Sequence, residues 1–181
     1  MTNQNNNETK QEQRKMGVGM FVLAWIALIV LLVGFFHQQL SHQFNPNQQL
    51  QSQTSSPGIN EVILEPNRQH HYILNGLING HSVVFLLDTG ATDVVIPQHM
   101  AQKLQLKVGR KQYASTANGT ISVYSTQLNS IDIGGIVLTN IRASINPAMK
   151  EEVILLGMSA LREIEFAQRG DTLLLRQLPA L

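Results

Sequence analysis

The segment 16–36 constrains this chain most, because it contains no charged residue along its whole length. Most of its positions are Val, Leu, Ile, Phe, Ala, Met or Gly. As a helix, such a segment spans roughly 30 Å, which matches the hydrocarbon core of a bilayer. A core helix of a small domain rarely runs this long without a polar face. The sequence therefore predicts a single transmembrane helix over 16–36, with the remaining chain divided around it.

The competing interpretation of segment 16–36 is a cleaved signal peptide. The apolar region of such a peptide usually has about 7–15 residues and ends at a small-x-small cleavage site. The run here is longer, and Phe35-Phe36-His37-Gln38-Gln39 follows it. These features favour an uncleaved anchor. Lys10, Arg14 and Lys15 precede the span, and no Lys or Arg follows until Arg68. The positive-inside rule therefore places the N-terminus in the cytoplasm and the rest of the chain outside it.

Composition divides the remaining chain into three parts. Residues 1–15 are polar and rich in Asn and Gln, which is typical of a disordered tail. Residues 37–60 are rich in Gln, Asn and Ser and contain two prolines, so we expect a linker there. The folded domain is expected over 61–181. Acidic and basic residues balance in it without a basic stripe, so nucleic acid is not expected as a partner.

No residue pattern indicates a cofactor. The chain contains no cysteine, which excludes a disulfide framework and a thiol nucleophile. Its six histidines show no spacing typical of a metal site, and the adjacent His70 and His71 would point to opposite faces of a strand. A G-x-S-x-G nucleophile motif is also absent from the sequence. We therefore expect neither a metal nor an organic cofactor.

The domain is predicted to be mostly β. Turn signals occur at Asn79-Gly80, Ala117-Asn118-Gly119 and Gly134-Gly135, each between apolar or β-branched runs. Pro97 can open a short helix through Leu104, and 158–163 suits one or two helical turns. Hairpins at this spacing indicate a small closed or partly closed β-barrel. The expected strands are 72–78, 82–87, 94–96, 111–116, 120–128, 131–133, 136–145, 153–156 and 172–176.

One carboxylate occupies an unusual position in this pattern. Asp88-Thr89-Gly90-Ala91 follows the apolar run 83–87 and precedes Val94-Val95-Ile96. Asp-x-Gly is ordinary turn chemistry by itself. Between two buried strands, however, a carboxylate is costly unless it is hydrogen-bonded, paired or used for chemistry. A later strand ends in Leu155-Leu156-Gly157, and a hairpin lies between the two elements.

This ordered set resembles the retropepsin-like (retroviral-type) aspartic proteases over about residues 70–176, and it is closest to their membrane-anchored bacterial branch. The resemblance implies a small closed acid-protease β-barrel with Asp88 as catalytic residue. It also implies that six residues support the catalytic loop, namely Thr89, Gly90, Ala91, Leu155, Leu156 and Gly157. The hairpin residues Ala117, Asn118 and Gly119 would form the substrate-binding flap.

The function implied by this resemblance is a membrane-anchored aspartic endopeptidase, with its domain on the periplasmic or extracytoplasmic side of a bacterial inner membrane. Two aspartates that share a proton would activate a water for peptide hydrolysis. The chain holds one Asp-Thr-Gly, so the pair is expected from a homodimer, with Thr89 bonding across the interface. The alternative is a non-catalytic module of the same fold that dimerises or binds peptides at the membrane.

The sequence departs from the retroviral pattern at two places. Retroviral enzymes commonly carry an acidic residue directly after Asp-Thr-Gly-Ala, and Arg or Asn just after the later glycine. Here those places hold Thr92 and Met158-Ser159. Ion pairs that support the retroviral dimer are therefore not expected in the same form.

Overall fold

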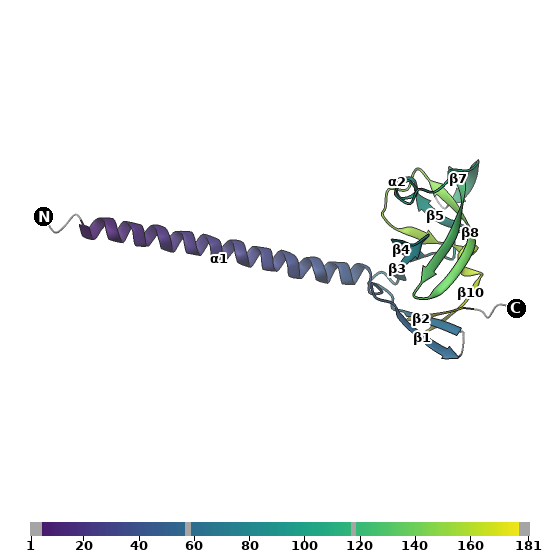
Figure 1. Ribbon diagram of the computed structural model, residues 1–181, viewed down its shortest axis with the longest axis horizontal. Coiled ribbons are helices and arrows are strands. Elements are labelled where there is room, and N and C mark those ends of the chain that lie inside the picture. Colours follow the sequence, from purple (N-terminus) through teal and green to yellow (C-terminus); the bar gives the residue numbers. More distant parts are fainter. Residues whose placement is uncertain (1–4, 57–58, 117–118, 178–181) are drawn as a thin grey trace. The chain divides into compact units, whose positions relative to one another are not determined.

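The computed structural model describes residues 5–56, 59–116 and 119–177, and the chain divides into two units, Met1–Ser41 and His42–Leu181. Helix α1 (Asn5–Phe44) makes up the described part of the first unit and is drawn as one uninterrupted helix in Figure 1. It begins inside the predicted disordered tail and continues past the predicted end of the span at residue 36. Proline cannot extend a helix, and Pro46 follows two residues after its end.

Within α1, the stretch Gly19–Phe44 is long and apolar enough to cross a membrane, and an 18-residue window of it has a mean hydropathy of 2.7. None of that window is buried, so its apolar side chains have no protein core to pack into. Among the described residues it is the one helix with these properties. An N-terminal apolar helix of this kind is compatible with a membrane anchor and with a signal sequence.

The second unit is mostly β, as predicted, with two short helices. Helix α2 spans Gln98–Lys103, after Pro97, and α3 spans Met158–Leu161. The strands are β1 (Gln51–Ser56), β2 (Ile59–Leu64), β3 (Ile73–Ile78), β4 (His81–Leu87), β5 (Val94–Pro97), β6 (Lys111–Thr116), β7 (Gly119–Ile133), β8 (Ile136–Asn146), β9 (Ile154–Leu156), β10 (Ile164–Arg169) and β11 (Thr172–Gln177).

The larger sheet closes on itself as a barrel. Its order is β3-β4-β9-β5-β8-β7-β6, and β3 also pairs with β7 through Leu77–Asp132 and Ile78–Ile131. The long strands β7 and β8 lie side by side in Figure 1. β7 is continuous where two strands were predicted, because Ser130 keeps its pairing with β8. β6 lies beyond β7 at the end of the sheet and extends the wall as a hairpin arm.

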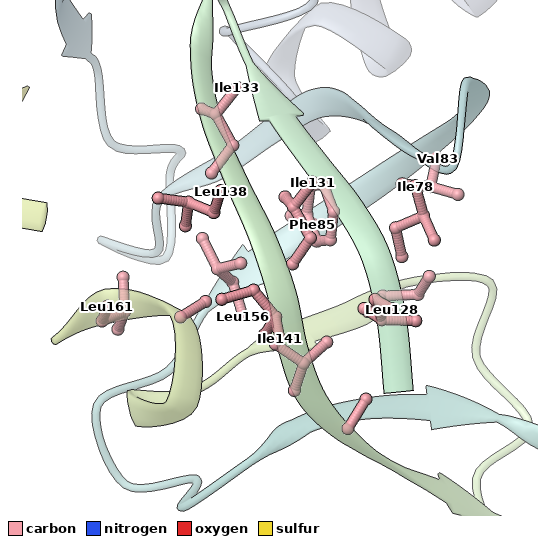
Figure 2. Packing of buried hydrophobic residues seen from close by; sticks show 14 of the residues in the cluster. Ile78, Val83, Phe85, Leu128, Ile131, Ile133, Leu138, Ile141, Leu156 and Leu161 are labelled. Atoms are coloured by element: carbon pink, nitrogen blue, oxygen red, sulfur yellow. The ribbon is translucent and has the colours of Figure 1, made fainter. Parts of the chain in front are cut away.

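Apolar side chains from several strands fill the barrel. Phe85 of β4, Leu128 and Ile131 of β7, and Leu156 of β9 are fully buried. Figure 2 shows these side chains in one cluster, with Leu161 of α3 at its margin. Each such side chain contributes about 1.5–3 kcal/mol by leaving water. The strand that leads into Asp88, β4, and its neighbour β9 are thus both fixed in this core.

A smaller sheet has the order β1-β2-β11-β10. Arg176 of β11 donates from Nε to Glu61 Oε1 of β2 at 2.6 Å, and Arg176 Nη1 lies 3.2 Å from Glu165 Oε2 of β10. The hydrogen bond to Glu61 and its charge raise the pKa of Arg176 above its ordinary value, so the guanidinium stays charged. The sequence analysis missed β1, β2 and β10. Gln-rich β1 and charged β10 lack the apolar alternation that indicates a strand, and β2 begins inside the predicted linker.

The predicted linker 37–60 differs most from the structure. Asn47 is 5% exposed, and its side chain donates to the carbonyls of Glu65 (2.8 Å) and Ile73 (2.7 Å). It also accepts a 2.8 Å hydrogen bond from the Glu65 N–H. Asn45 donates to Asn75 Oδ1 at 2.9 Å. These polar bonds and the packing of Leu50 against the core hold the segment on the domain, so the folded unit begins near residue 42.

Candidate active site

Asp88 lies in a tight turn directly after β4. Its N–H donates to the Leu156 carbonyl at 3.1 Å, and its carbonyl accepts from Ala91 N–H at 3.2 Å. Its carboxylate oxygen Oδ1 accepts from the Gly90 N–H at 2.9 Å. The turn therefore holds the Asp88 backbone on both sides, and the Gly90 N–H orients its carboxylate, as expected for Asp-x-Gly chemistry.

The Asp88 carboxylate is not sealed inside the single chain. Asp88 is half-buried, and Thr89 and Gly90 are exposed. A cavity of about 370 Å³ borders the turn and is lined by Tyr72, Leu87, Asp88, Thr89, Phe166, Gln168 and Leu173. Asp88 is the one acidic group in this lining, within the described part of the chain. The sequence predicted a more buried carboxylate, but the turn leaves the barrel wall as soon as β4 ends.

Gly157 packs directly behind the turn. A Cβ built on Gly157 would lie 2.7 Å from the Ala91 carbonyl oxygen and even closer to the Asp93 carbonyl. Met158 N–H donates to Ala91 O at 2.8 Å, and Ser159 N–H donates to Thr92 O at 2.9 Å. Leu155, one residue before Leu156 on β9, pairs with Leu86 of β4. The structure thus brings the motifs Asp88-Thr89-Gly90-Ala91 and Leu155-Leu156-Gly157 together, with their backbones in direct contact.

Ser159 is a residue of this site that the sequence did not single out. It is 3% exposed, and its hydroxyl donates to Arg142 O at 2.7 Å. The same oxygen accepts a 2.9 Å hydrogen bond from Val94 N–H, at the start of β5. Ser159 therefore fixes the far end of the loop that begins at Asp88. Its position two residues after Gly157 could have indicated this role, but the sequence analysis noted Ser159 only as a departure from the retroviral pattern.

An ion pair also holds this loop. Asp93 Oδ1 accepts from Arg142 Nε on β8 at 2.8 Å, and the Asp93 side chain is 21% exposed. The loop thus has an acidic anchor within its own chain, one position later than the retroviral pattern places it. This carboxylate is engaged by Arg142, so it is not a second acid beside Asp88.

The other aspartates have structural places. Asp132 Oδ1 accepts from Gly135 N–H at 2.8 Å in the β7–β8 turn. Asp171 lies exposed in the β10–β11 turn, where its backbone carbonyl accepts from the Tyr72 hydroxyl at 3.0 Å. Among residues 5–56, 59–116 and 119–177, no three His, Asp or Glu side chains gather as metal ligands do.

The predicted flap corresponds to the β6–β7 hairpin. Ala117 and Asn118 lie outside the described residues. Gly119 opens β7 with a φ of +109°, a conformation that favours glycine. Thr116 Oγ1 donates to Gly119 O at 2.7 Å, which closes the described end of the hairpin. Most side chains of β6 are exposed.

Comparison with known proteins agrees with this geometry. Residues 74–163 match the family described as "gag-polyprotein putative aspartyl protease". The structure is similar to the crystal structure of a retropepsin-like aspartic protease from Rickettsia conorii, with a TM-score of 0.54 and 28% identity. That similarity covers 71% of this chain and 95% of the other. It confirms the predicted fold class.

Two bacterial proteins are similar over more than the folded unit. An uncharacterized protein in the cobV 5′ region of Sinorhizobium sp is 28% identical over 179 residues, covering 92% of this chain and 77% of the relative. Uncharacterized protein RP867 of Rickettsia prowazekii (strain Madrid E) is 27% identical over 162 residues, covering 87% and 69%. Both shares exceed what residues 42–181 alone make up, so the similarity extends into α1.

Proposed function

Because the folded domain of this chain belongs to the retropepsin-like aspartyl protease family, we propose that it is a membrane-anchored aspartic endopeptidase that acts as a homodimer. The observation that carries this proposal is the Asp88 turn. Its carboxylate accepts from the Gly90 N–H and its backbone N–H donates to the Leu156 carbonyl, yet the carboxylate remains open to a cavity. A fixed carboxylate beside an open cavity suits a group that meets substrate.

The reaction needs a second carboxylate. Two aspartates about 3 Å apart cannot both ionise, so they share one proton, as the aspartic proteases illustrate. The ionised member takes a proton from a water between them, and the protonated member donates to the scissile carbonyl oxygen. The titration then belongs to the pair and not to either residue alone.

No other aspartate in the described part of the chain is placed to supply the second carboxylate. Asp93 is bound by Arg142, Asp132 caps the β7–β8 turn, and Asp171 lies in another turn. Asp88 of a second copy is the remaining aspartate that can complete the pair. A two-fold axis would then pass between the two Asp88 side chains.

The N-terminal helix supports a place at the membrane. Gly19–Phe44 has the length and hydropathy of a span. Lys10, Arg14 and Lys15 precede it, which favours a cytoplasmic N-terminus and an extracytoplasmic domain in a bacterial cell membrane. Anchoring in two dimensions raises the local concentration of the domain and favours dimers.

Substitution of Asp88 tests the proposal. The full chain in detergent is incubated with a peptide library, and Asp88→Asn is expected to abolish cleavage while the melting temperature stays near that of the unmodified protein. Asp171→Asn, an exposed aspartate in a turn, is the matched control and should retain activity. Cleavage that persists in purified Asp88→Asn protein, or peptide binding without turnover in the unmodified protein, would overturn it.

A mixing experiment tests the shared pair separately. Unmodified chains are equilibrated with an excess of Asp88→Asn chains. If each protomer supplies one carboxylate, mixed dimers are inactive, so activity per unmodified chain falls as the excess grows. A complete active site within one chain predicts activity that is independent of the added variant.

A further inference from the structure

A second cavity of the folded unit carries positive charge and has no role in the chemistry at Asp88. Its volume is about 470 Å³, and it is lined by Lys107, Gly109, Ser125, Thr126, Gln127 and Arg142. Two of these side chains are cationic and none is acidic, so we call it the cationic cavity. It has no lining residue in common with the cavity beside Asp88.

One wall of the cationic cavity is backbone fixed onto β7. Gly109 N–H donates to the Ser125 carbonyl at 2.8 Å, and Thr126 Oγ1 donates to the Lys107 carbonyl at 2.8 Å. A Cβ on Gly109 would lie 2.6 Å from both the carbonyl oxygen and the Oγ of Ser125, so a side chain there would collide with β7. These contacts fix the backbone of Lys107 at the cavity.

The other cation comes from β8. Arg142 lies directly opposite Gln127 in the β7–β8 ladder, next to the position of Thr126. Its Nε donates to Asp93 Oδ1 at 2.8 Å, and its side chain is 58% exposed. A guanidinium has five N–H donors, and the four on its Nη atoms are not used by this bond. Arg142 can therefore bind a second acceptor while it holds Asp93.

The Lys107 ammonium is also available. Lys107 is exposed, and its side chain makes no hydrogen bond or ion pair within residues 5–56, 59–116 and 119–177. Between Asp93 and Asp132 the sequence contains no Asp or Glu and four basic residues, Lys103, Lys107, Arg110 and Lys111. The charge of Asp93 offsets one cation of the cavity, so one positive charge remains. An anion that enters the cationic cavity is therefore attracted.

The cationic cavity lies within reach of a peptide bound at Asp88. Asp93 follows Asp88 by five residues, so their Cα atoms are at most about 18 Å apart. An extended peptide advances about 3.3 Å per residue and covers that distance in about five residues. On the other side of the cavity, segment 107–110 leads directly into β6, the first strand of the predicted flap. The cavity therefore lies between the end of the Asp88 loop and the base of that hairpin.

We propose that the cationic cavity binds a Glu or Asp side chain of the peptide substrate through Lys107 and Arg142. A carboxylate accepts charge-assisted hydrogen bonds from both an ammonium and a guanidinium. This inference rests on the proposed function, because the peptide that is cleaved at Asp88 supplies the carboxylate. A two-fold dimer holds two such cavities, one on each side of its axis. The favoured substrates are therefore peptides with acidic residues on both sides of the scissile bond, at equal spacing from it.

Peptides that differ at one position test this preference. A peptide that the full chain cleaves in detergent is synthesised with Glu or with Gln at each position up to about five residues from the scissile bond. At the position that reaches the cationic cavity, kcat/KM should be roughly three- to tenfold higher for Glu, as expected for a partly exposed charge contact. Added salt should reduce this ratio by screening. Equal values for Glu and Gln at every position would contradict the proposal.

Substitution of Lys107 tests whether the cavity causes the preference. Lys107→Glu should remove the preference for Glu, whereas Lys107→Arg keeps the charge and should retain it. Arg68→Glu, at an exposed position before β3, changes the net charge equally and is the matched control. Melting temperatures show that each variant is folded. If Lys107→Glu and Arg68→Glu reduce the preference equally, the overall charge of the chain sets it and the proposal fails.

A binding measurement gives a readout that does not need cleavage. Fluorescein-labelled octapeptides that alternate Ala with Glu, or Ala with Gln, are titrated with Asp88→Asn chains in detergent, and fluorescence anisotropy reports the dissociation constant. The Glu peptide should bind roughly three- to tenfold more tightly than the Gln peptide. The difference should vanish when Lys107→Glu is added to Asp88→Asn and persist when Arg68→Glu is added.

The outcomes separate this inference from the proposed function. If cleavage depends on Asp88 but neither rates nor binding distinguish Glu from Gln, the carboxylate site fails and the protease proposal stands. If the Glu peptide binds through Lys107 but no form of the protein hydrolyses peptides, the cationic cavity is a binding site for acidic peptides and the protease proposal fails.

Discussion

Gly157 lies against the Ala91 carbonyl so closely that a Cβ on Gly157 would be 2.7 Å from that oxygen. The two backbone segments are joined by a hydrogen bond, since the N–H of Met158, next to Gly157, donates to the same Ala91 oxygen at 2.8 Å. Neither side can move away without breaking a bond that positions the Asp88 turn. Glycine at 157 is therefore required by the contact between the end of β9 and the loop that begins at Asp88.

Gly157→Ala is expected to lower the free energy of unfolding by about 2–4 kcal/mol, because overpacking here meets backbone and not a flexible side chain. Thermal unfolding of the full chain measures this, and peptide cleavage should fall with it. Gly80→Asn is the control, since a Cβ at Gly80 meets nothing within 4 Å and its φ of +82° lies in a region that Asn tolerates. Equal stability of the two variants would contradict the close contact.

Ser159→Ala is expected to destabilise the loop end through Val94. The variant leaves the buried Val94 N–H and the Arg142 carbonyl without the hydroxyl that they share. A buried unsatisfied group costs about 1–3 kcal/mol, so the melting temperature should fall measurably. Ser144→Ala, a serine that is 6% exposed and has no side-chain hydrogen bond within the described part of the chain, should change stability by less than about 0.5 kcal/mol. Similar losses in both variants would assign no special role to Ser159.

Much of the barrel could be predicted because its strands obey local rules. Asn79-Gly80 and Gly134-Gly135 have positive φ at both turn residues, as two-residue hairpins need, and their hairpins lie as predicted. Asp88 and Leu155-Leu156-Gly157 could be related to each other through family resemblance. Their physical contact depends on a parallel pairing of β4 with β9, which no local pattern reveals.

The remaining elements depend on partners distant in sequence. Strand β1 is Gln-rich, and its strand conformation depends on pairing with β2. Arg176 of β11 forms an ion pair with Glu61 of β2, at the opposite end of the domain's sequence. Composition described 37–60 as a linker because it has few apolar residues among many Gln, Asn and Ser. That argument fails where buried amides satisfy backbone groups: Asn45 accepts from the Asn47 N–H, and Asn47 donates to the Glu65 and Ile73 carbonyls.

Asn47→Asp tests whether this segment is part of the folded unit. The carboxylate cannot donate to the Glu65 and Ile73 carbonyls and would face both of them, so we expect a loss of about 2–4 kcal/mol in stability. Gln49→Glu, at an exposed position of the same segment, introduces the same charge and should change stability by less than about 0.5 kcal/mol. Equal stability of both variants and the unmodified chain would restore the linker interpretation.

Thr89→Val is expected to weaken the dimer without unfolding the chain. Thr89 is exposed beside the cavity, and its hydroxyl makes no hydrogen bond within the described residues. A hydroxyl of this kind next to Asp88 is available to a second copy, as family resemblance implies. Removing it leaves the partner group unsatisfied at the interface, so the dimer dissociation constant should rise roughly tenfold or more.

Sedimentation of the full chain in detergent measures this change, and the melting temperature shows whether the fold is kept. Thr89→Ser retains the hydroxyl and should sediment as the unmodified protein does. Thr120→Val, at an exposed threonine of β7, has the same change in shape and should leave the dimer intact. If Thr89→Val and Thr120→Val have the same dissociation constant, the Thr89 hydroxyl does not bond across the interface.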